Sequence, residues 1–89
     1  MKINLELFGA SKDFSEKDYL ELEVQDKASI NDLRNEIIKY LNKNFEGNES
    51  FIKIVKSSAF CSENNEIISD NYKITKNQKI GIIPPIGGG

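Results

Sequence analysis

The chain has 89 residues, of which 14 are acidic and 12 are basic, so its formal net charge is −2. This length suits one small domain with a single hydrophobic core. The slightly acidic balance disfavours nucleic acid as a partner, because proteins that bind nucleic acid usually present a basic surface. The sequence has no histidine, which excludes histidine metal sites and nucleophiles activated by histidine.

The sequence also carries no sign of export or of a membrane span. Its one cysteine, Cys61, has no partner for an internal disulfide, which is typical of a reducing compartment. No apolar stretch approaches the length of a membrane-spanning helix, and the first residues alternate polar and apolar instead of forming a signal peptide. We therefore expect a cytoplasmic protein without a membrane partner.

Alternating apolar residues predict two antiparallel strands at the start of the chain. One runs from Lys2 to Phe8 and the other from Tyr19 to Val24, with a loop over residues 9–15 between them. A period of two is typical of strands with one buried face. The residues expected on that face are Ile3, Leu5, Leu7, Leu20, Leu22 and Val24. Phe8 has the opposite parity, so we expect its side chain on the face away from the core.

A helix is predicted from Ile30 to about Lys43. Ser29 is a favoured N-cap residue, and Asp32 follows three residues later as a short-armed capping box. Apolar residues recur at helical spacing and form one stripe. The members of this stripe are Ile30, Leu33, Ile37, Tyr40 and Leu41.

Further strands are expected in the second half of the chain. Alternation predicts one from Phe51 to Ser57 and the last from Lys79 to Ile83, while Ile67 and Ile68 indicate a brief edge strand. Residues 59–61 either continue the strand before them or begin the next short one. The residues that mark turns in this half include Asn71, Lys76, Asn77 and Gln78.

This order of elements predicts an α+β fold with a mixed sheet. A single main helix packs best when its apolar stripe covers one face of the sheet. The first and last strands then lie side by side and parallel in the middle, with the helix in the crossover between them. This is the β-grasp, or ubiquitin-like, arrangement, and we expect one such domain over residues 1–89.

The last six residues predict a tail, residues 84–89, that leaves this domain. Pro84 and Pro85 end the final strand, because proline lacks the N–H that a central strand needs. Gly87, Gly88 and Gly89 have no Cβ, so they can lie extended in a slot too narrow for other residues. A glycine-rich end is often only a frayed terminus. After a double proline in a β-grasp order, we expect a flexible tail whose carboxylate is a reactive handle.

The chain resembles the MoaD family, the small subunits of molybdopterin synthase. The opening strand that ends in Phe8-Gly9-Ala10 and the helix start at Ser29-Ile30 agree with that family. The specific match is the run from Lys79 to Ile86 followed by Gly88-Gly89. The likeness extends over essentially the whole chain, and only the tail is distinctive.

The resemblance implies a sulfur carrier that is not an enzyme on its own. An ATP-dependent adenylating enzyme would activate the carboxylate of Gly89, which then becomes a thiocarboxylate. The tail would enter the large synthase subunit, where Gly87 and Gly88 would pass through a narrow channel. The thiocarboxylate would then give its sulfur to a pyranopterin precursor of the molybdenum cofactor. No permanently bound cofactor or metal is implied, and a hetero-oligomer is expected. The residues expected to contact these partners are Phe8, Pro84, Pro85 and Ile86.

Other functions remain open at this point. Related carriers serve cysteine, thiamine or tungsten-cofactor synthesis, although thiamine carriers tend to be shorter and to lack the double proline. A ubiquitin-like modifier, joined to lysines through Gly89, is the alternative from another class. Cys61 is expected to be structural rather than a sulfur relay. One acidic cluster is either a solvated face or a surface for a basic partner; its members are Asp13, Glu16, Asp18, Glu21 and Glu23.

Overall fold

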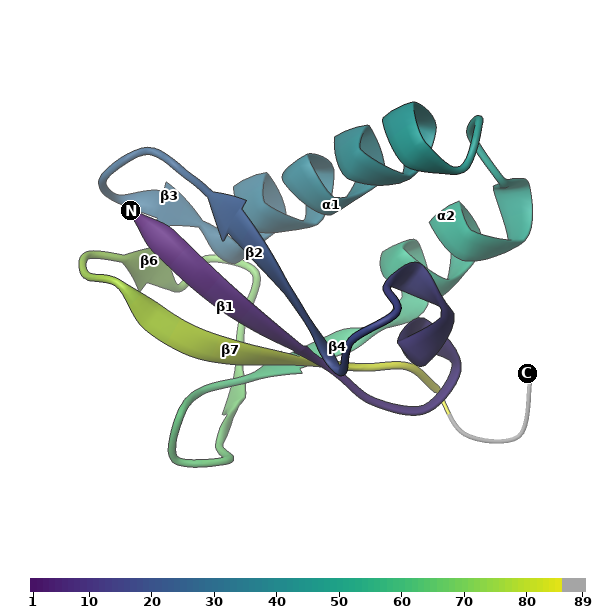
Figure 1. Ribbon diagram of the computed structural model, residues 1–89. Coiled ribbons are helices and arrows are strands. Elements are labelled where there is room, and N and C mark those ends of the chain that lie inside the picture. Colours follow the sequence, from purple (N-terminus) through teal and green to yellow (C-terminus); the bar gives the residue numbers. More distant parts are fainter. Residues whose placement is uncertain (86–89) are drawn as a thin grey trace.

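A five-stranded sheet forms the centre of the computed structural model, which describes residues 1–85 (Figure 1). Its strands are β1 (Lys2–Leu7), β2 (Tyr19–Glu23), β4 (Ala59–Cys61), β5 (Ile67–Ile68) and β7 (Gln78–Ile83). They lie in the order β2-β1-β7-β4-β5, with β1 and β7 parallel and the other pairs antiparallel. This is the predicted β-grasp, with the first and last strands at its centre.

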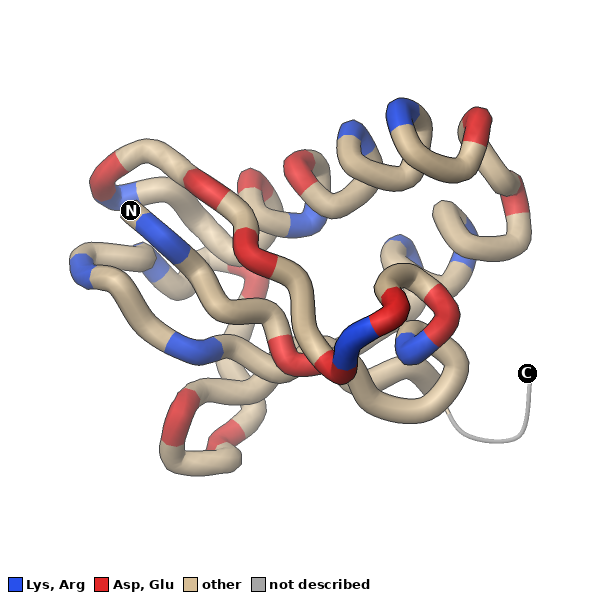
Figure 2. Tube along the Cα trace, in the orientation of Figure 1, with Lys and Arg blue, Asp and Glu red and all other residues tan. Residues whose placement is uncertain are grey.

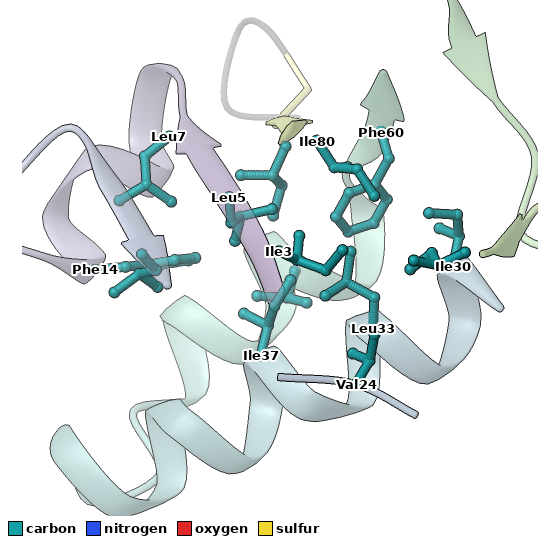
Figure 3. Close-up of a cluster of buried hydrophobic side chains, with 14 of the residues drawn as sticks. Ile3, Leu5, Leu7, Phe14, Val24, Ile30, Leu33, Ile37, Phe60 and Ile80 are labelled. Carbon is teal, nitrogen blue, oxygen red and sulfur yellow. The ribbon is translucent and has the colours of Figure 1, made fainter. Parts of the chain in front are cut away.

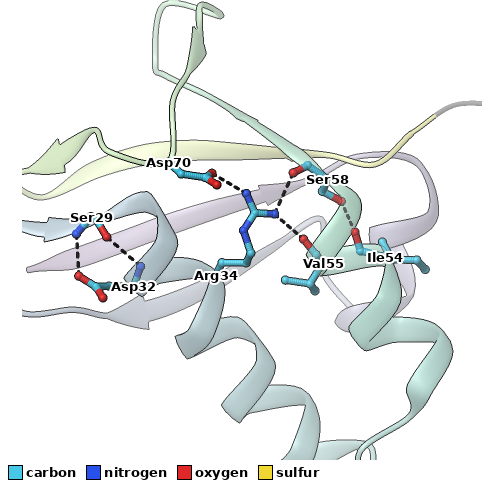
Figure 4. A network of polar contacts seen from close by, with 7 residues as sticks. All are labelled: Ser29, Asp32, Arg34, Ile54, Val55, Ser58 and Asp70. Carbon is cyan, nitrogen blue, oxygen red and sulfur yellow. Dashed lines mark hydrogen bonds and ion pairs between the residues drawn. The ribbon is translucent and has the colours of Figure 1, made fainter.

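Helix α1 (Ile30–Asn44) crosses one face of the sheet and is held at its start by the predicted capping box (Figure 4). The Ser29 hydroxyl accepts a hydrogen bond from the Asp32 N–H at 3.1 Å, and the Asp32 carboxylate accepts one from the Ser29 N–H at 2.9 Å. The bond from the Ser29 backbone is the main cause of the lowered pKa of Asp32. The predicted helix and its N-cap are therefore confirmed.

The hydrophobic core lies between α1 and the sheet (Figure 3). Side chains of β1 and β7 meet the buried stripe of α1, and the residues with at most 1% exposure there are Ile3, Leu5, Leu7, Ile30, Leu33, Ile37, Leu41, Ile80 and Ile82. Burial of each such side chain stabilises the fold by roughly 1.5–3 kcal/mol. The alternation in the sequence therefore identified the buried faces of both central strands correctly.

Helix α2 (Glu49–Ser57) occupies the segment for which alternation predicted a strand, so that prediction is wrong. The Asn48 side chain caps this helix by accepting a hydrogen bond from the Phe51 N–H at 3.1 Å. Val55, one helical turn later, is fully buried, and the ring of Phe51 lies 5.1 Å from that of Phe14. A short apolar run fits both the two-residue period of a strand and the 3.6-residue period of a helix. The N-cap asparagine was the local signal that favoured a helix.

Several short elements complete the fold. A 3₁₀ helix, η1 (Gly9–Phe14), stands where a loop was predicted, and β3 (Ala28–Ser29) pairs with β6 (Lys73–Ile74), a pairing that the sequence did not indicate. Gln78 begins β7 rather than lying in a turn. Residues 59–61 form a strand of their own beside β7, and the expected edge strand at 67–68 is confirmed. Within residues 1–85, no helix is both long and apolar enough to cross a membrane.

Arg34 joins α1 to the end of α2 and to the loop before β6 (Figure 4). Its Nη1 donates hydrogen bonds to the carbonyl oxygens of Val55 and Ser58 at 2.6 and 2.9 Å, and its Nη2 lies 2.7 Å from a carboxylate oxygen of Asp70. The guanidinium also lies 4.9 Å from the ring centroid of Phe60. The Val55 carbonyl oxygen also accepts from the Ser58 N–H at 3.3 Å. Arg34 therefore adds a charged donor at the end of α2, where the last carbonyls of a helix have no partner in the regular helical ladder.

We expect Arg34→Met to lower the free energy of unfolding by about 2–3 kcal/mol, because it leaves two carbonyl oxygens without their charged donor. Asp70→Asn is the matched control, since the Asp70 side chain is 61% exposed. An exposed ion pair contributes at most about 1 kcal/mol. Urea unfolding measures both variants. Equal losses in the two variants would contradict the role of Arg34 at the end of α2.

Candidate functional site

The two parallel central strands end side by side, and this places the end of β1 next to the root of the tail (Figure 1). Leu7 pairs with Ile82, so the residues that follow each strand are also neighbours. Gly9 turns the chain with a φ of +55°, and the ring carbons of Pro84 lie 4.0 Å from the point that a Cβ of Gly9 would occupy. Pro84 therefore packs against the turn that follows β1.

Phe8 lies on the face of the sheet opposite α1, which we call the open face. Its backbone is fixed by the fully buried Ser11, whose hydroxyl accepts from the Phe8 N–H at 3.0 Å and donates to the Phe8 carbonyl oxygen at 2.6 Å. Its side chain is 37% exposed. The parity of Phe8 in the sequence therefore predicted its face correctly, and its contact with a partner stays a prediction.

Gly81 provides the space in which the Phe8 ring lies across β7. A Cβ at this position would come within 2.9 Å of Phe8 Cε2 and 2.7 Å of Cys61 Sγ. Cys61 is a free, buried thiol, so it acts as part of the packing here. A glycine inside a strand often marks such a close approach. The glycine between two isoleucines was the signal in the sequence for this close approach.

Apolar residues share the open face with Phe8. Cys61 pairs with Gly81 on one side and with Ile67 on the other, and Ala59 pairs with Ile83, so all of these residues share one face. We define the open-face patch as Phe8, Ala59, Cys61, Ile67, Gly81 and Ile83. Ile67 is 67% exposed. An apolar patch of this kind is typical of a surface that binds another protein.

Charged residues border the open-face patch. Lys79 Nζ lies 2.9 Å from a carboxylate oxygen of Glu6, and the backbone N–H of Lys79 donates to Glu63 at 3.3 Å. The hydrogen bond to Glu6, then the charges of Glu6 and Glu63, raise the pKa of Lys79. A hollow of about 260 Å³ lies between these groups, Phe8 and Cys61. The patch thus has an apolar centre and a charged rim, as protein interfaces do.

The predicted site residues fall into three groups. Phe8 and Pro85 are exposed, so a partner can reach them. Pro84 is buried within the chain itself. The other predicted residues lie outside the described residues; they are Ile86, Gly87, Gly88 and Gly89. Among the residues that the structure describes, no three His, Cys, Asp or Glu side chains converge as metal ligands would.

We expect Gly81→Ala to lower the free energy of unfolding by about 1–3 kcal/mol, because the new methyl would lie within 2.9 Å of both Phe8 Cε2 and Cys61 Sγ and overpack this part of the sheet. The same substitution made together with Phe8→Ala and Cys61→Ala should cost at least about 1 kcal/mol less, since both neighbours that crowd it are then small. Guanidinium unfolding gives this difference when it is measured on four proteins: the natural chain, Gly81→Ala, the Phe8→Ala/Cys61→Ala double variant, and the variant with all three substitutions. An unchanged cost would show that Gly81 is not needed for the packing of Phe8.

Known proteins were compared with this sequence and fold. The model of the ThiS family matches residues 5–89, which is nearly the whole chain and includes the tail. No curated protein matches the sequence.

Three solved structures share the fold at low sequence identity. A protein of Pyrococcus furiosus described as molybdopterin converting factor subunit 1 has a TM-score of 0.69 and 21% identity, over 96% of this chain and 98% of that one. Small archaeal modifier protein 1 of Haloferax volcanii has a TM-score of 0.68 and 14% identity, over 100% of both chains. A ubiquitin of Caldiarchaeum subterraneum has a TM-score of 0.60 and 18% identity, over 100% of this chain and 98% of that one. These structures establish the ubiquitin-like fold, and the match over residues 5–89 establishes that the chain belongs to the ThiS family.

Proposed function

We propose that this chain is a sulfur carrier whose Gly89 carboxylate is converted to a thiocarboxylate. The observation that carries the proposal is the ThiS family match, because it continues through the glycines at residues 87–89. The chain itself then needs no catalytic group, which agrees with a sequence that lacks histidine. A separate adenylating enzyme performs the activation.

The chemistry requires two steps, because a carboxylate is a poor electrophile. In the first, an oxygen of the Gly89 carboxylate attacks the α-phosphorus of ATP, which forms an acyl adenylate and releases pyrophosphate. In the second, a sulfide nucleophile attacks the acyl carbon and AMP leaves with the bonding electron pair. The product is a thiocarboxylate, in which one carboxylate oxygen has been replaced by sulfur. Neither step oxidises or reduces the chain.

The open-face patch and Pro85 fit the need to present the tail to another protein. Five extended residues from Pro85 to Gly89 span roughly 16–18 Å, enough to enter a site below a partner's surface. Because Pro84 packs against Gly9, the tail begins at a fixed point beside Phe8. A partner that binds the patch therefore receives the tail at a defined position, which lowers the ordering cost of docking.

The pathway we assign is molybdopterin synthesis. The molecule that accepts the sulfur would then be bound by the large subunit of molybdopterin synthase. The tail sequence and the fold shared with the Pyrococcus furiosus protein described as molybdopterin converting factor subunit 1 support this assignment. The residues of this chain would position sulfur there, and the large subunit would bind the pyranopterin precursor. No residue in the described part of the chain is assigned to catalysis.

A second candidate function is that of a protein modifier. The fold shared with small archaeal modifier protein 1 and with a ubiquitin supports it. The activation step is the same, but the acyl group then passes to the amine of a lysine instead of to sulfur. The two functions therefore differ in the nucleophile that attacks the activated Gly89.

Mass spectrometry separates these functions. We expect the full-length chain, incubated with ATP, sulfide and its adenylating enzyme, to exchange one oxygen for sulfur at Gly89. Isopeptide-linked adducts without sulfur would instead identify a modifier. The intact mass of the natural protein should also equal that of a chain whose last residue is Gly89. A larger mass, from a chain that continues beyond Gly89, would contradict the proposal.

Lengthening the tail by one glycine after Gly89 should lower sulfur transfer at least about 100-fold, because a shift of about 1 Å in a reacting group already has effects of that size. The matched control adds one glycine before Met1, where an amide N–H can still donate to the Val24 carbonyl oxygen as the terminal ammonium does at 2.8 Å. Single-turnover transfer to the acceptor measures both. Equal activity of the two variants would rule out a mechanism through the terminal carboxylate.

A further inference from the structure

Strand β2 is an outer edge of the sheet, since it pairs with β1 on one side and with no other strand in residues 1–85. Val24 and Met1 exchange backbone hydrogen bonds at 2.8 and 2.9 Å, and the Leu7 N–H donates to the Asp18 carbonyl oxygen at 2.9 Å. In an antiparallel ladder, such bonded pairs alternate with residues whose backbone groups point outward. The residues that present these free groups along the edge are Tyr19, Glu21 and Glu23.

A groove of about 730 Å³ runs beside this edge, between β2, the C-terminal part of α1 and residues 13–17. Three consecutive residues of β2 line it, Tyr19 to Glu21, so the groove reaches the strand edge itself. Its apolar wall includes Leu20, Tyr40 and Phe45. The Tyr40 hydroxyl donates to the Phe14 carbonyl oxygen at 2.8 Å and its ring lies 6.1 Å from that of Phe45, so this wall is fixed in place.

The groove and the edge carry an excess of negative charge. The lining includes three acidic residues, Asp13, Glu16 and Glu21, and one basic residue, Lys17, which gives a formal charge of −2. None of the ion pairs within residues 1–85 uses any of these three acids. Glu21 faces Asn4 across the ladder rather than a base, whereas Glu23 faces Lys2. Figure 2 shows acidic positions recurring along the trace of β2 and in the segment before it.

We propose that the β2 edge binds an extended segment of a partner protein in which basic and apolar residues alternate. The partner's backbone would pair with the outward groups of Tyr19, Glu21 and Glu23, as in β-strand addition. Its side chains would then point alternately to the two faces of the sheet. Those on the open face lie beside Glu21, which favours lysine or arginine, and those on the other face enter the groove beside Leu20, Tyr40 and Phe45.

This surface is separate from the one proposed for sulfur transfer. The open-face patch lies at the far end of the sheet order, over β7, β4 and β5, whereas β2 is the opposite edge. A chain could therefore bind a partner through β2 while the tail is engaged elsewhere. The inference does not depend on the thiocarboxylate, and it can fail or succeed independently of the proposed function.

The test uses the peptide acetyl-Lys-Val-Lys-Val-Lys-Val-amide, titrated into the full-length ¹⁵N-labelled chain. We expect saturable shift changes in the amide signals of Tyr19, Leu20, Glu21 and Phe45, and weaker binding at higher salt because exposed charges are screened. Three matched peptides probe the mechanism. Replacement of lysine by glutamate should abolish binding, and N-methylation of the alternate amides that face β2 should do the same, while N-methylation of the other amides should not.

Glu21→Lys should weaken binding of the basic peptide roughly five- to tenfold, because it replaces an attraction between exposed charges with a repulsion. Glu66→Lys is the matched control, since Glu66 is an exposed acid in the turn before β5 and should leave binding unchanged. Removal of Gly89 should also leave binding unchanged, which separates this surface from the tail.

Four results would overturn the proposal. They are failure of the basic peptide to bind at millimolar concentration, equal binding of the acidic peptide, insensitivity to both patterns of N-methylation, and shift changes centred on Phe8 and Gly81 instead of β2. If the glutamates of β2 served only to prevent pairing with other strands, neither the basic nor the acidic peptide would bind. Dimerisation of the chain through β2 would identify a second copy as the occupant, and would likewise contradict a basic partner.

Discussion

The parallel pairing of β1 with β7 is the constraint on which the rest of the structure depends. Parallel neighbours cannot be joined by a tight turn, so the intervening chain must cross over the sheet, and here α1 makes that crossing. The register that sets Leu7 against Ile82 buries the alternate residues of both strands under α1. It also makes Phe8 and the tail root neighbours. A shift of one residue would turn every one of these side chains to the other face.

Much of this arrangement follows from periodicity in the sequence. The buried faces of β1 and β7, the extent of α1 and its Ser29–Asp32 cap are all local patterns, and each is confirmed. Segment 49–57 shows where local patterns fail, since an apolar run so short fits both a strand and a helix. Its helical state is stabilised by tertiary contacts, with Arg34 at its end and Phe14 against Phe51. Neither contact is visible from the segment alone.

The candidate site was predictable only in part, for a similar reason. The tail prolines and glycines form a linear motif, and parity alone put Phe8 on the open face. The approach of the Phe8 ring to Gly81 joins residues more than 50 positions apart in the chain, so it needs the strand register. The free edge of β2 is likewise a property of strand order, because β2 comes first in the sheet and pairs only with β1 among the described strands.

The proposed carrier function agrees with a fold whose described residues include no exposed thiol and no imidazole. The one cysteine is buried between Gly81 and its neighbours, and there is no histidine, so the described part of the chain offers its own activated terminus no accessible thiol or imidazole. An acyl adenylate reacts with whichever nucleophile reaches it first. In the proposed function, a chain without an accessible thiol of its own leaves the supply of the sulfur nucleophile to a partner protein, and protein surfaces select that partner. We therefore propose the open-face patch and the β2 edge as the two surfaces that determine which partners this small chain binds.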